Sequence, residues 1–137
     1  MDDRLTTMSK LLLQFRDERD WKQFHNPKDQ ALSLVLEAAE LLELTQWKNG
    51  DELDRHLTDR REELSDELAD VLGWCLLIAA DRGIDLAQAF HRKLAKNHAK
   101  YPKDKVRGSA RKYTEYKSKT PRAGKRKQAR RSRSGAK

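Results

Sequence analysis

Cysteine and long apolar runs are the two things this chain most clearly lacks. Its 137 residues include one cysteine, Cys75, so no disulfide can form within the chain. We interpret Cys75 as a small buried apolar residue of a helix. No apolar stretch reaches the ~18–20 residues needed to span a bilayer, and no signal peptide is recognisable. These absences predict one soluble, cytoplasmic domain with a single hydrophobic core and no membrane partner.

Acidic residues are missing from the end of the chain. Residues 117–137 contain ten Lys and Arg, no Asp or Glu, and no large apolar side chain, whereas residues 1–116 contain 22 acidic and 20 basic residues. We therefore predict a folded, mildly acidic domain over 1–116 and a disordered basic tail over 117–137. Such a tail is suited to non-specific contact with nucleic acid, although a solubilising or localisation role fits it as well.

Strand patterns are also absent, because no window of residues 1–116 alternates with period two for long enough. The apolar residues recur at helical spacing instead, and we predict four helices at about residues 4–20, 27–48, 59–82 and 86–100. Asn26 and Asp85 are suited to capping helix starts, and Gly83 to ending a helix. Residues 49–58 are expected to form a polar connector or a short helix. The predicted fold class is all-α, a four-helix bundle.

Two acidic pairs interrupt the apolar runs of the second and third predicted helices, Glu37 with Glu40 and Glu67 with Asp70. Residues spaced i, i+3 share a helix face, so each pair directs two carboxylates the same way. Acidic pairs are common on solvated faces, but Leu and Val surround these on nearly all sides, which favours burial. Four carboxylates in a nearly dry core would repel one another, and a divalent cation relieves that repulsion. Oxygen-only ligands favour Mg²⁺, with Mn²⁺ as a substitute.

Further acidic residues extend these two faces. Glu43 continues the first face, where it is expected to orient water, to bind another metal ion or to be peripheral. Glu63 and Asp66 repeat the spacing one turn before Glu67, so they either support the ligands or belong to the solvated surface. None of the four His lies three residues after a Glu, which excludes the Glu-x-x-His pairs of a di-iron bundle. A hard cation in a helical bundle instead indicates phosphate chemistry.

The acidic pattern resembles that of the MazG-like superfamily of all-α nucleoside triphosphate pyrophosphohydrolases, and most closely its dCTP pyrophosphatase branch. Glu37-x-x-Glu40 is followed by 26 residues and then by Glu67-x-x-Asp70. Five segments carry the resemblance in order: 18–27 (ERDWKQFHNP), 37–48 (EAAELLELTQWK), 63–72 (ELSDELADVL), 93–102 (KLAKNHAKYP) and 107–114 (RGSARKYT). The similarity spans about residues 5–116, and it implies a MazG-like bundle.

The resemblance also implies a reaction. A nucleoside triphosphate and water would give the monophosphate and pyrophosphate in a Mg²⁺-dependent step, with dCTP or a modified dCTP as substrate and cleansing of the nucleotide pool as the role. The metal ligands would be Glu37, Glu40, Glu67 and Asp70. Relatives form homo-dimers or tetramers with sites shared between subunits, and the same is expected here.

The remaining site residues follow from the matching segments. The residues that match a nucleobase pocket are Trp21, His25, Trp47 and Trp74, and each offers a π face for stacking. The residues that match positions near the phosphates are Lys93, Asn97 and Tyr101. Ordinary core packing is the alternative for each Trp, and a solvated surface is the alternative for Lys93. Another class of function also stays open, in which a helical nucleic-acid-binding or scaffold protein acts through the basic tail.

Overall fold

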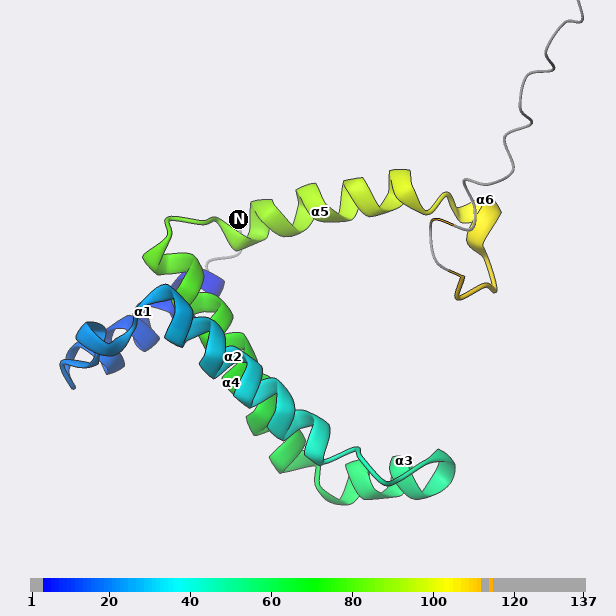
Figure 1. Ribbon diagram of the computed structural model, residues 1–137, viewed down its shortest axis with the longest axis horizontal. Coiled ribbons are helices and arrows are strands. Elements are labelled where there is room, and N and C mark those ends of the chain that lie inside the picture. Colours follow the sequence, from blue (N-terminus) through cyan, green and yellow to red (C-terminus); the bar gives the residue numbers. More distant parts are fainter. Residues whose placement is uncertain (1–3, 112–113, 115–137) are drawn as a thin grey trace, which may run out of the picture. The chain divides into compact units, whose positions relative to one another are not determined.

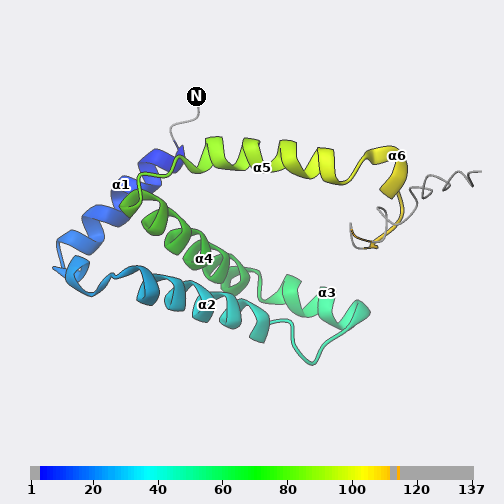
Figure 2. The ribbon, with the colours of Figure 1, turned by 45° about the horizontal axis from the view of Figure 1, so that its top comes forward.

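The computed structural model describes residues 4–111 and 114, and within these residues the chain is helical, with no strand (Figures 1 and 2). The elements are α1 (Arg4–Asp17), the 3-10 turn η1 (Trp21–Phe24), α2 (Pro27–Glu43), α3 (Gly50–Asp59), α4 (Arg61–Asp81), α5 (Leu86–Lys100) and α6 (Lys103–Val106). The predicted all-α class is confirmed. The predicted basic tail, 117–137, lies outside the described residues.

The chain divides into two compact units, with the boundary between Lys93 and Leu94 inside α5. In the first unit α2 lies lengthwise against α4, while α1 and α3 also contact α4 (Figure 2). The predicted end of the folded domain at residue 116 lies among residues that the structure does not describe, and it stays a prediction. In the described part of the chain, no helix combines the length and apolar character needed to cross a membrane.

Local signals located several helix ends correctly. The Asn26 side chain accepts hydrogen bonds from the backbone N–H groups of Lys28 and Asp29 at 3.1 and 3.0 Å, and so caps α2. The Asp85 carboxylate accepts one from the N–H of Gln88 at 2.9 Å, at the start of α5. Gly83 has a φ of 61°, the left-handed conformation that commonly ends a helix.

Other boundaries differ from the prediction. α1 ends at Asp17 and α2 at Glu43, in both cases before the expected residues 20 and 48. Neither helix can extend as far as predicted, because Asp20 and Trp47 adopt left-handed φ values of 54° and 69° that a right-handed helix does not contain. Residues 50–59 form α3, and α6 is a further short helix that the four-helix prediction did not include.

The buried core of the described chain is small and includes polar groups. Its apolar members are Leu44, Leu76, Leu77 and Ala79. Arg16 and Gln30 are buried beside them, at 3% and 1% exposure. Many large apolar residues of α2 and α4 are exposed instead, so the two helices carry more apolar surface than this unit covers.

Candidate metal centre and base pocket

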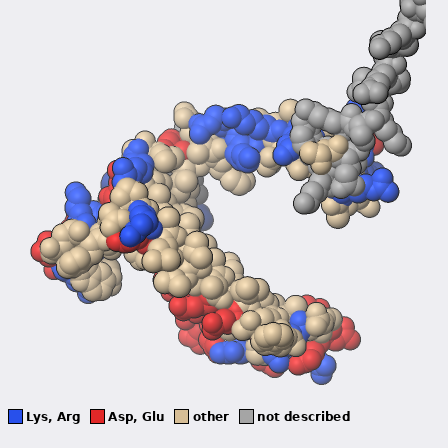
Figure 3. All heavy atoms as spheres, viewed as in Figure 1, with Lys and Arg blue, Asp and Glu red and all other residues tan. Residues whose placement is uncertain are grey.

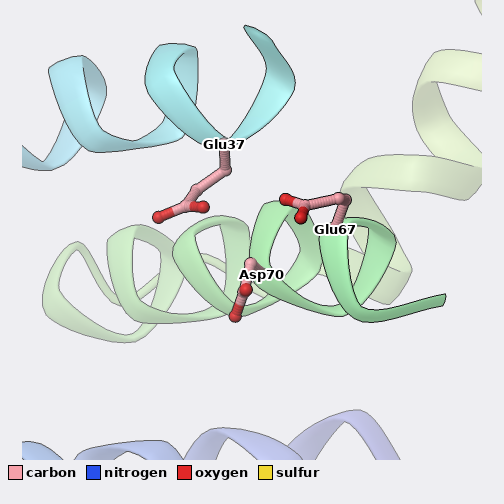
Figure 4. A group of neighbouring side chains, drawn as sticks. All are labelled: Glu37, Glu67 and Asp70. Atoms are coloured by element: carbon pink, nitrogen blue, oxygen red, sulfur yellow. The ribbon is translucent and has the colours of Figure 1, made fainter. Parts of the chain in front are cut away.

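Three of the predicted ligands come together where α2 meets α4. Glu37 on α2 and Glu67 and Asp70 on α4 each offer a carboxylate oxygen, and these oxygens lie within 4.8 Å of one another. Figure 4 shows Glu37 reaching from α2 towards α4, with Glu67 and Asp70 one turn apart on the facing helix. The i, i+3 spacing of Glu67 and Asp70 therefore does what the sequence predicted, because it places both residues beside Glu37.

Glu67 is in the least favourable electrostatic position of this group. It is half-buried, and its Oε2 atom is buried without a hydrogen-bond partner. Burial raises the pKa of Glu67 above 4.5, and the negative charges of Glu40, Asp70, Glu37 and Asp66 raise it further. A buried carboxylate oxygen that lacks a donor and faces other carboxylates fits a hard divalent cation.

The other acidic candidates surround this group without joining it. Glu40 and Asp70 are exposed while Glu37 and Glu67 are half-buried, so the predicted dry core is wrong. The reason is geometric, since two packed helices shield only the side chains along their line of contact. Figure 3 shows acidic side chains gathered where α2 ends and α4 begins. The neighbours are exposed: Glu43 at the last position of α2, Glu63 paired with Arg60, and Asp66.

A cavity of about 170 Å³ lies beside the acidic group. Its wall includes three aromatic residues predicted to bind a base, Trp21, His25 and Trp74, together with Asp70. The rest of the lining comes from α1 and α4: Leu12, Phe15, Arg16, Gly73 and Leu77. Asp70 belongs both to this wall and to the acidic group, so the cavity and the group share one carboxylate.

Aromatic contacts join the cavity walls. The rings of His25 and Trp74 lie with centroids 5.2 Å apart, and Trp21 meets Phe15 edge-on at 5.9 Å. The Nδ1 atom of His25 is buried and has no hydrogen-bond partner. The Trp74 indole Nε1–H donates to Glu37 Oε1 at 3.2 Å, so this ring supports a carboxylate of the acidic group. The sequence pattern contained no signal for that hydrogen bond, which joins residues 37 positions apart.

Four predicted site residues remain, and two of them, Trp47 and Lys93, do not line this cavity. Trp47 is 90% exposed. Lys93 is the last residue of the first unit, and Asn97 and Tyr101 belong to the second. Lys93 is exposed on α5, where Lys and Arg side chains gather (Figure 3). The part of these four residues in substrate binding stays a prediction.

A buried polar cluster near the cavity was missed by sequence reasoning. Arg16 Nη1 donates to Asp81 Oδ1 and Oδ2 at 2.9 and 3.0 Å, and Gln30 Nε2 donates to Asp81 Oδ2 at 2.6 Å. Burial alone would raise the pKa of Asp81, but the hydrogen bonds from Arg16 and Gln30 outweigh it and hold the pKa below 3.8. These contacts tie α1, α2 and α4 together. No short-range pattern signals them, because the partners are 65 and 51 residues apart.

Comparisons with known proteins identify the family of this chain. A family profile described as the MazG-like family matches residues 32–116. The chain belongs to the MazG-like family. The dCTP pyrophosphatase 1 proteins of Bos taurus and Homo sapiens are each 42% identical to it over 113 residues, which cover 81% of this chain and 67% and 66% of those proteins.

A solved structure supports the same family. The crystal structure of a pyrophosphatase from Archaeoglobus fulgidus matches with a TM-score of 0.70 and 36% identity, over 74% of this chain and 95% of that one. This MazG-like protein therefore belongs to the dCTP pyrophosphatase branch, and it is an enzyme of the nucleoside triphosphate pyrophosphatase class.

Proposed function

We propose that this MazG-like pyrophosphatase depends on Mg²⁺ and hydrolyses dCTP or a modified dCTP to the monophosphate and pyrophosphate. The observation that carries the proposal is the double position of Asp70, which lines the aromatic cavity and also belongs to the acidic group. A base held by the rings would therefore extend its phosphates towards the carboxylates. The similarity to proteins named dCTP pyrophosphatase 1 supports cytosine as the base.

We propose that Glu37, Glu67 and Asp70 hold the metal ion, with Glu40 contributing from one turn further along α2. Once bound, Mg²⁺ would neutralise phosphate oxygens as a Lewis acid. Mn²⁺ has the same preference for oxygen ligands and is the expected substitute. The unpartnered Oε2 of Glu67 supports this assignment, because a cation supplies the positive charge that its surroundings lack.

We propose that the aromatic side chains select the base. Stacking on a ring such as that of Trp74 or Trp21 stabilises a base by about 1–3 kcal/mol. His25 Nδ1 is available for a hydrogen bond, because it is buried without a partner beside this cavity. A ring that hydrogen-bonds to the base edge discriminates between bases, which stacking alone does not.

The remaining candidates have proposed roles as well. We propose that Trp47 covers the base from outside, that Lys93, Asn97 and Tyr101 contact the phosphates, and that Glu43 orients water. The proposed setting is the cytoplasmic nucleotide pool, where the enzyme removes unwanted triphosphates.

The test is pyrophosphate release from a panel of nucleoside triphosphates with Mg²⁺ and with EDTA. We expect the highest kcat/KM with dCTP or a 5-substituted dCTP, and no release with EDTA. Glu37→Gln and Glu40→Gln should lower kcat on the order of 10³-fold, since metal-ion stabilisation of a transition state is worth several kcal/mol.

A matched control is Glu62→Gln, which removes an exposed carboxylate from the first turn of α4, outside the acidic group. It should behave as the wild type does. Hydrolysis that persists in EDTA would contradict the metal dependence, and release of orthophosphate alone would contradict the reaction.

The competing function assigns the activity to the basic tail. Deletion of residues 117–137 separates the two, because a pyrophosphatase of this kind keeps its kcat/KM without them. A nucleic-acid-binding protein would instead lose a partner whose affinity falls steeply with salt.

A further inference from the structure

Asp81 is the point at which three helices meet through polar contacts. One carboxylate accepts hydrogen bonds from Arg16 of α1 and from Gln30 of α2, as described above. The Gln30 amide has a defined orientation here, because turning it round would place its oxygen against the Asp81 carboxylate. Its Oε1 atom is buried without a hydrogen-bond partner, so the side-chain amide bonds to Asp81 alone.

These contacts close a loop that contains part of the base pocket. Arg16 precedes residues 17–29 and Gln30 follows them, so both ends of this segment are attached to the same carboxylate. The segment contains Trp21 and His25, which line the cavity. Inside it, the left-handed residue Asp20 is tied to the turn, because the Gln23 amide donates to its backbone oxygen at 2.9 Å and to its carboxylate at 2.7 Å.

Asp81 also lies on the α4 face that forms the opposite wall. Asp70, Trp74, Leu77 and Asp81 are spaced by four, three and four residues, the spacing of one face of a helix, and the first three line the cavity. Eleven residues at 1.5 Å each put Asp81 about 16 Å along the axis from Asp70. That distance is too large for Asp81 to act on the phosphates, but its helix face is the one against which the segment is held.

Stability alone is a poor explanation for this cluster. Burying an Arg and a Gln, and most of an Asp, costs desolvation energy, and apolar side chains of similar size often stabilise a fold equally well. Apolar contacts are not directional. Hydrogen bonds from a guanidinium and an amide to one carboxylate are directional, and they fix the angle and separation of the helices that carry these side chains.

We propose that Arg16, Gln30 and Asp81 are positioning residues for the base pocket, which hold residues 17–29 so that Trp21 and His25 face Trp74 across the cavity. This inference rests on the proposed function, because it assigns nucleotide binding to that cavity. Disturbing the cluster would widen the pocket and weaken base binding, while the carboxylates between α2 and α4 stay in place.

The first experiment compares Asp81→Asn with Asp17→Asn. Asp17 bonds the same guanidinium at 2.9 Å, but from the neighbouring position of the same helix and with 55% side-chain exposure, so it joins no helices. We expect Asp81→Asn to raise KM for the preferred triphosphate about tenfold, with kcat within about twofold. Asp17→Asn should leave both unchanged.

A second variant separates positioning from stability. Arg16→Met/Gln30→Met/Asp81→Leu replaces the whole polar cluster by apolar side chains, so that no amide is left buried without a partner, and it is expected to fold with an unfolding midpoint close to that of the wild type. A positioning role predicts that its KM stays raised. If this variant folds and has the wild-type KM, the cluster serves only the fold and the proposal is overturned.

A spectroscopic readout needs no activity. The His25 ring lies beside the Trp74 indole, with centroids 5.2 Å apart, so its C–H signals in the NMR spectrum carry a ring-current shift. Asp81→Asn should move these signals towards those of free histidine, and Asp17→Asn should not. Unmoved His25 signals in Asp81→Asn would overturn the proposal.

The two proposals fail differently. If the wild type hydrolyses triphosphates and Asp81→Asn keeps its KM, the positioning inference fails and the proposed function stands. If the folded wild type hydrolyses none of them, the proposed function fails, and so does the expected rise in KM for Asp81→Asn. The His25 signals then still decide whether the cluster holds the segment.

Discussion

Glu67 combines a raised pKa, a buried oxygen without a donor and several negative neighbours. The surroundings of Glu67 therefore disfavour its ionised form in the folded state. Its ionisation reduces stability as pH rises through the raised pKa, unless a cation is bound. Repulsion between the carboxylates therefore lowers the stability of the folded state without the metal ion, and a bound metal ion removes this effect.

Glu67→Gln is expected to have opposite effects with and without Mg²⁺. In EDTA the variant should unfold at a higher temperature than the wild type, because one of the repelling charges is gone. With Mg²⁺ the wild type should gain about 2.7 kcal/mol when the free metal reaches 100 times its Kd, and the variant much less. Thermal unfolding with and without Mg²⁺ measures both effects. An equal Mg²⁺-induced gain in the variant would contradict the assignment, and Glu62→Gln serves as the matched control.

Trp74 has a polar role beside its stacking role. Trp74→Phe keeps an aromatic ring but removes the Nε1–H that donates to Glu37 Oε1 at 3.2 Å. Groups that orient metal ligands typically contribute 10–100-fold to metal affinity, so we expect Mg²⁺ affinity to fall about tenfold. A Mg²⁺ titration by calorimetry measures this. Trp21→Phe is the control, since Trp21 lines the cavity without belonging to the acidic group. Equal Mg²⁺ affinities for the two variants would refute this role.

The contribution of an N-cap hydrogen bond to stability can be measured by comparing two asparagines. Asn26 and Asn49 are both N-cap residues, but only the Asn26 side chain accepts backbone hydrogen bonds. Asn26→Ala should lower the free energy of unfolding by about 1 kcal/mol, whereas Asn49→Ala should change it by a few tenths. Urea unfolding of both variants gives the values, and equal losses would mean that the cap hydrogen bonds contribute nothing.

The stability that comes from packing α1 and α2 on α4 should fall at acidic pH. Because the hydrogen bonds of Asp81 hold its pKa below its ordinary 3.8, its ionised form stabilises the folded state. This contribution is fully present above the ordinary pKa and is lost as pH falls through the lowered one. The wild type should therefore lose more stability than Asp81→Asn as pH is lowered from about 5 towards 2. Urea midpoints across that range test this, and parallel curves for the two proteins would count against it.

Prediction from sequence succeeded where the determinant is local. The cap at Asn26 and the turn at Gly83 depend on a few neighbouring residues, and the spacing of Glu67 and Asp70 depends only on the pitch of one helix. It failed at Asp20 and Trp47, whose left-handed backbone no neighbouring residue signals. Asp adopts this conformation more readily than most residues but at no predictable position, and Trp rarely adopts it. Long-range pairs were out of reach as well, because nothing near Arg16 in the sequence indicates that its partner is Asp81.

The site shows the same difference between local features, which the sequence predicts, and long-range packing, which it does not. Helix pitch predicts which carboxylates share a face, and so it anticipated that Glu67 and Asp70 would meet a residue of the preceding acidic pair. It does not predict how far a second helix covers them, which is why the expected burial of Glu40 and Asp70 was wrong. Their surroundings depend on packing between elements, and in an assembled protein on surfaces of other chains.

Exposed apolar surface on α2 and α4 leads us to expect that this protein assembles with copies of itself. Val35 and Leu42 on α2 are 63% and 60% exposed, and Leu68 on α4 is 50% exposed. Apolar patches of this kind commonly mark interfaces, so we expect a homo-dimer or tetramer that buries them. This agrees with the assembly implied by the family resemblance.

A charge on this surface should dissociate the assembly. Val35→Glu is expected to raise the Kd of self-association on the order of 100-fold, because the new carboxylate would be buried without a partner. Sedimentation equilibrium measures the change. Lys10→Glu adds the same group at an exposed position of α1 and serves as the control. A wild type that stays monomeric at high concentration would contradict the expectation.

The attachment of residues 17–29 at both ends has a consequence for how this enzyme can change its substrate. The Arg16 and Gln30 contacts fix where the segment begins and ends, while the residues between them are mostly exposed and bear few constraints from the core. If Trp21 and His25 bind the base as proposed, substitutions there should alter which base fits without disturbing the carboxylates on α2 and α4. We therefore expect libraries confined to residues 17–29 to yield variants that hydrolyse triphosphates with other bases.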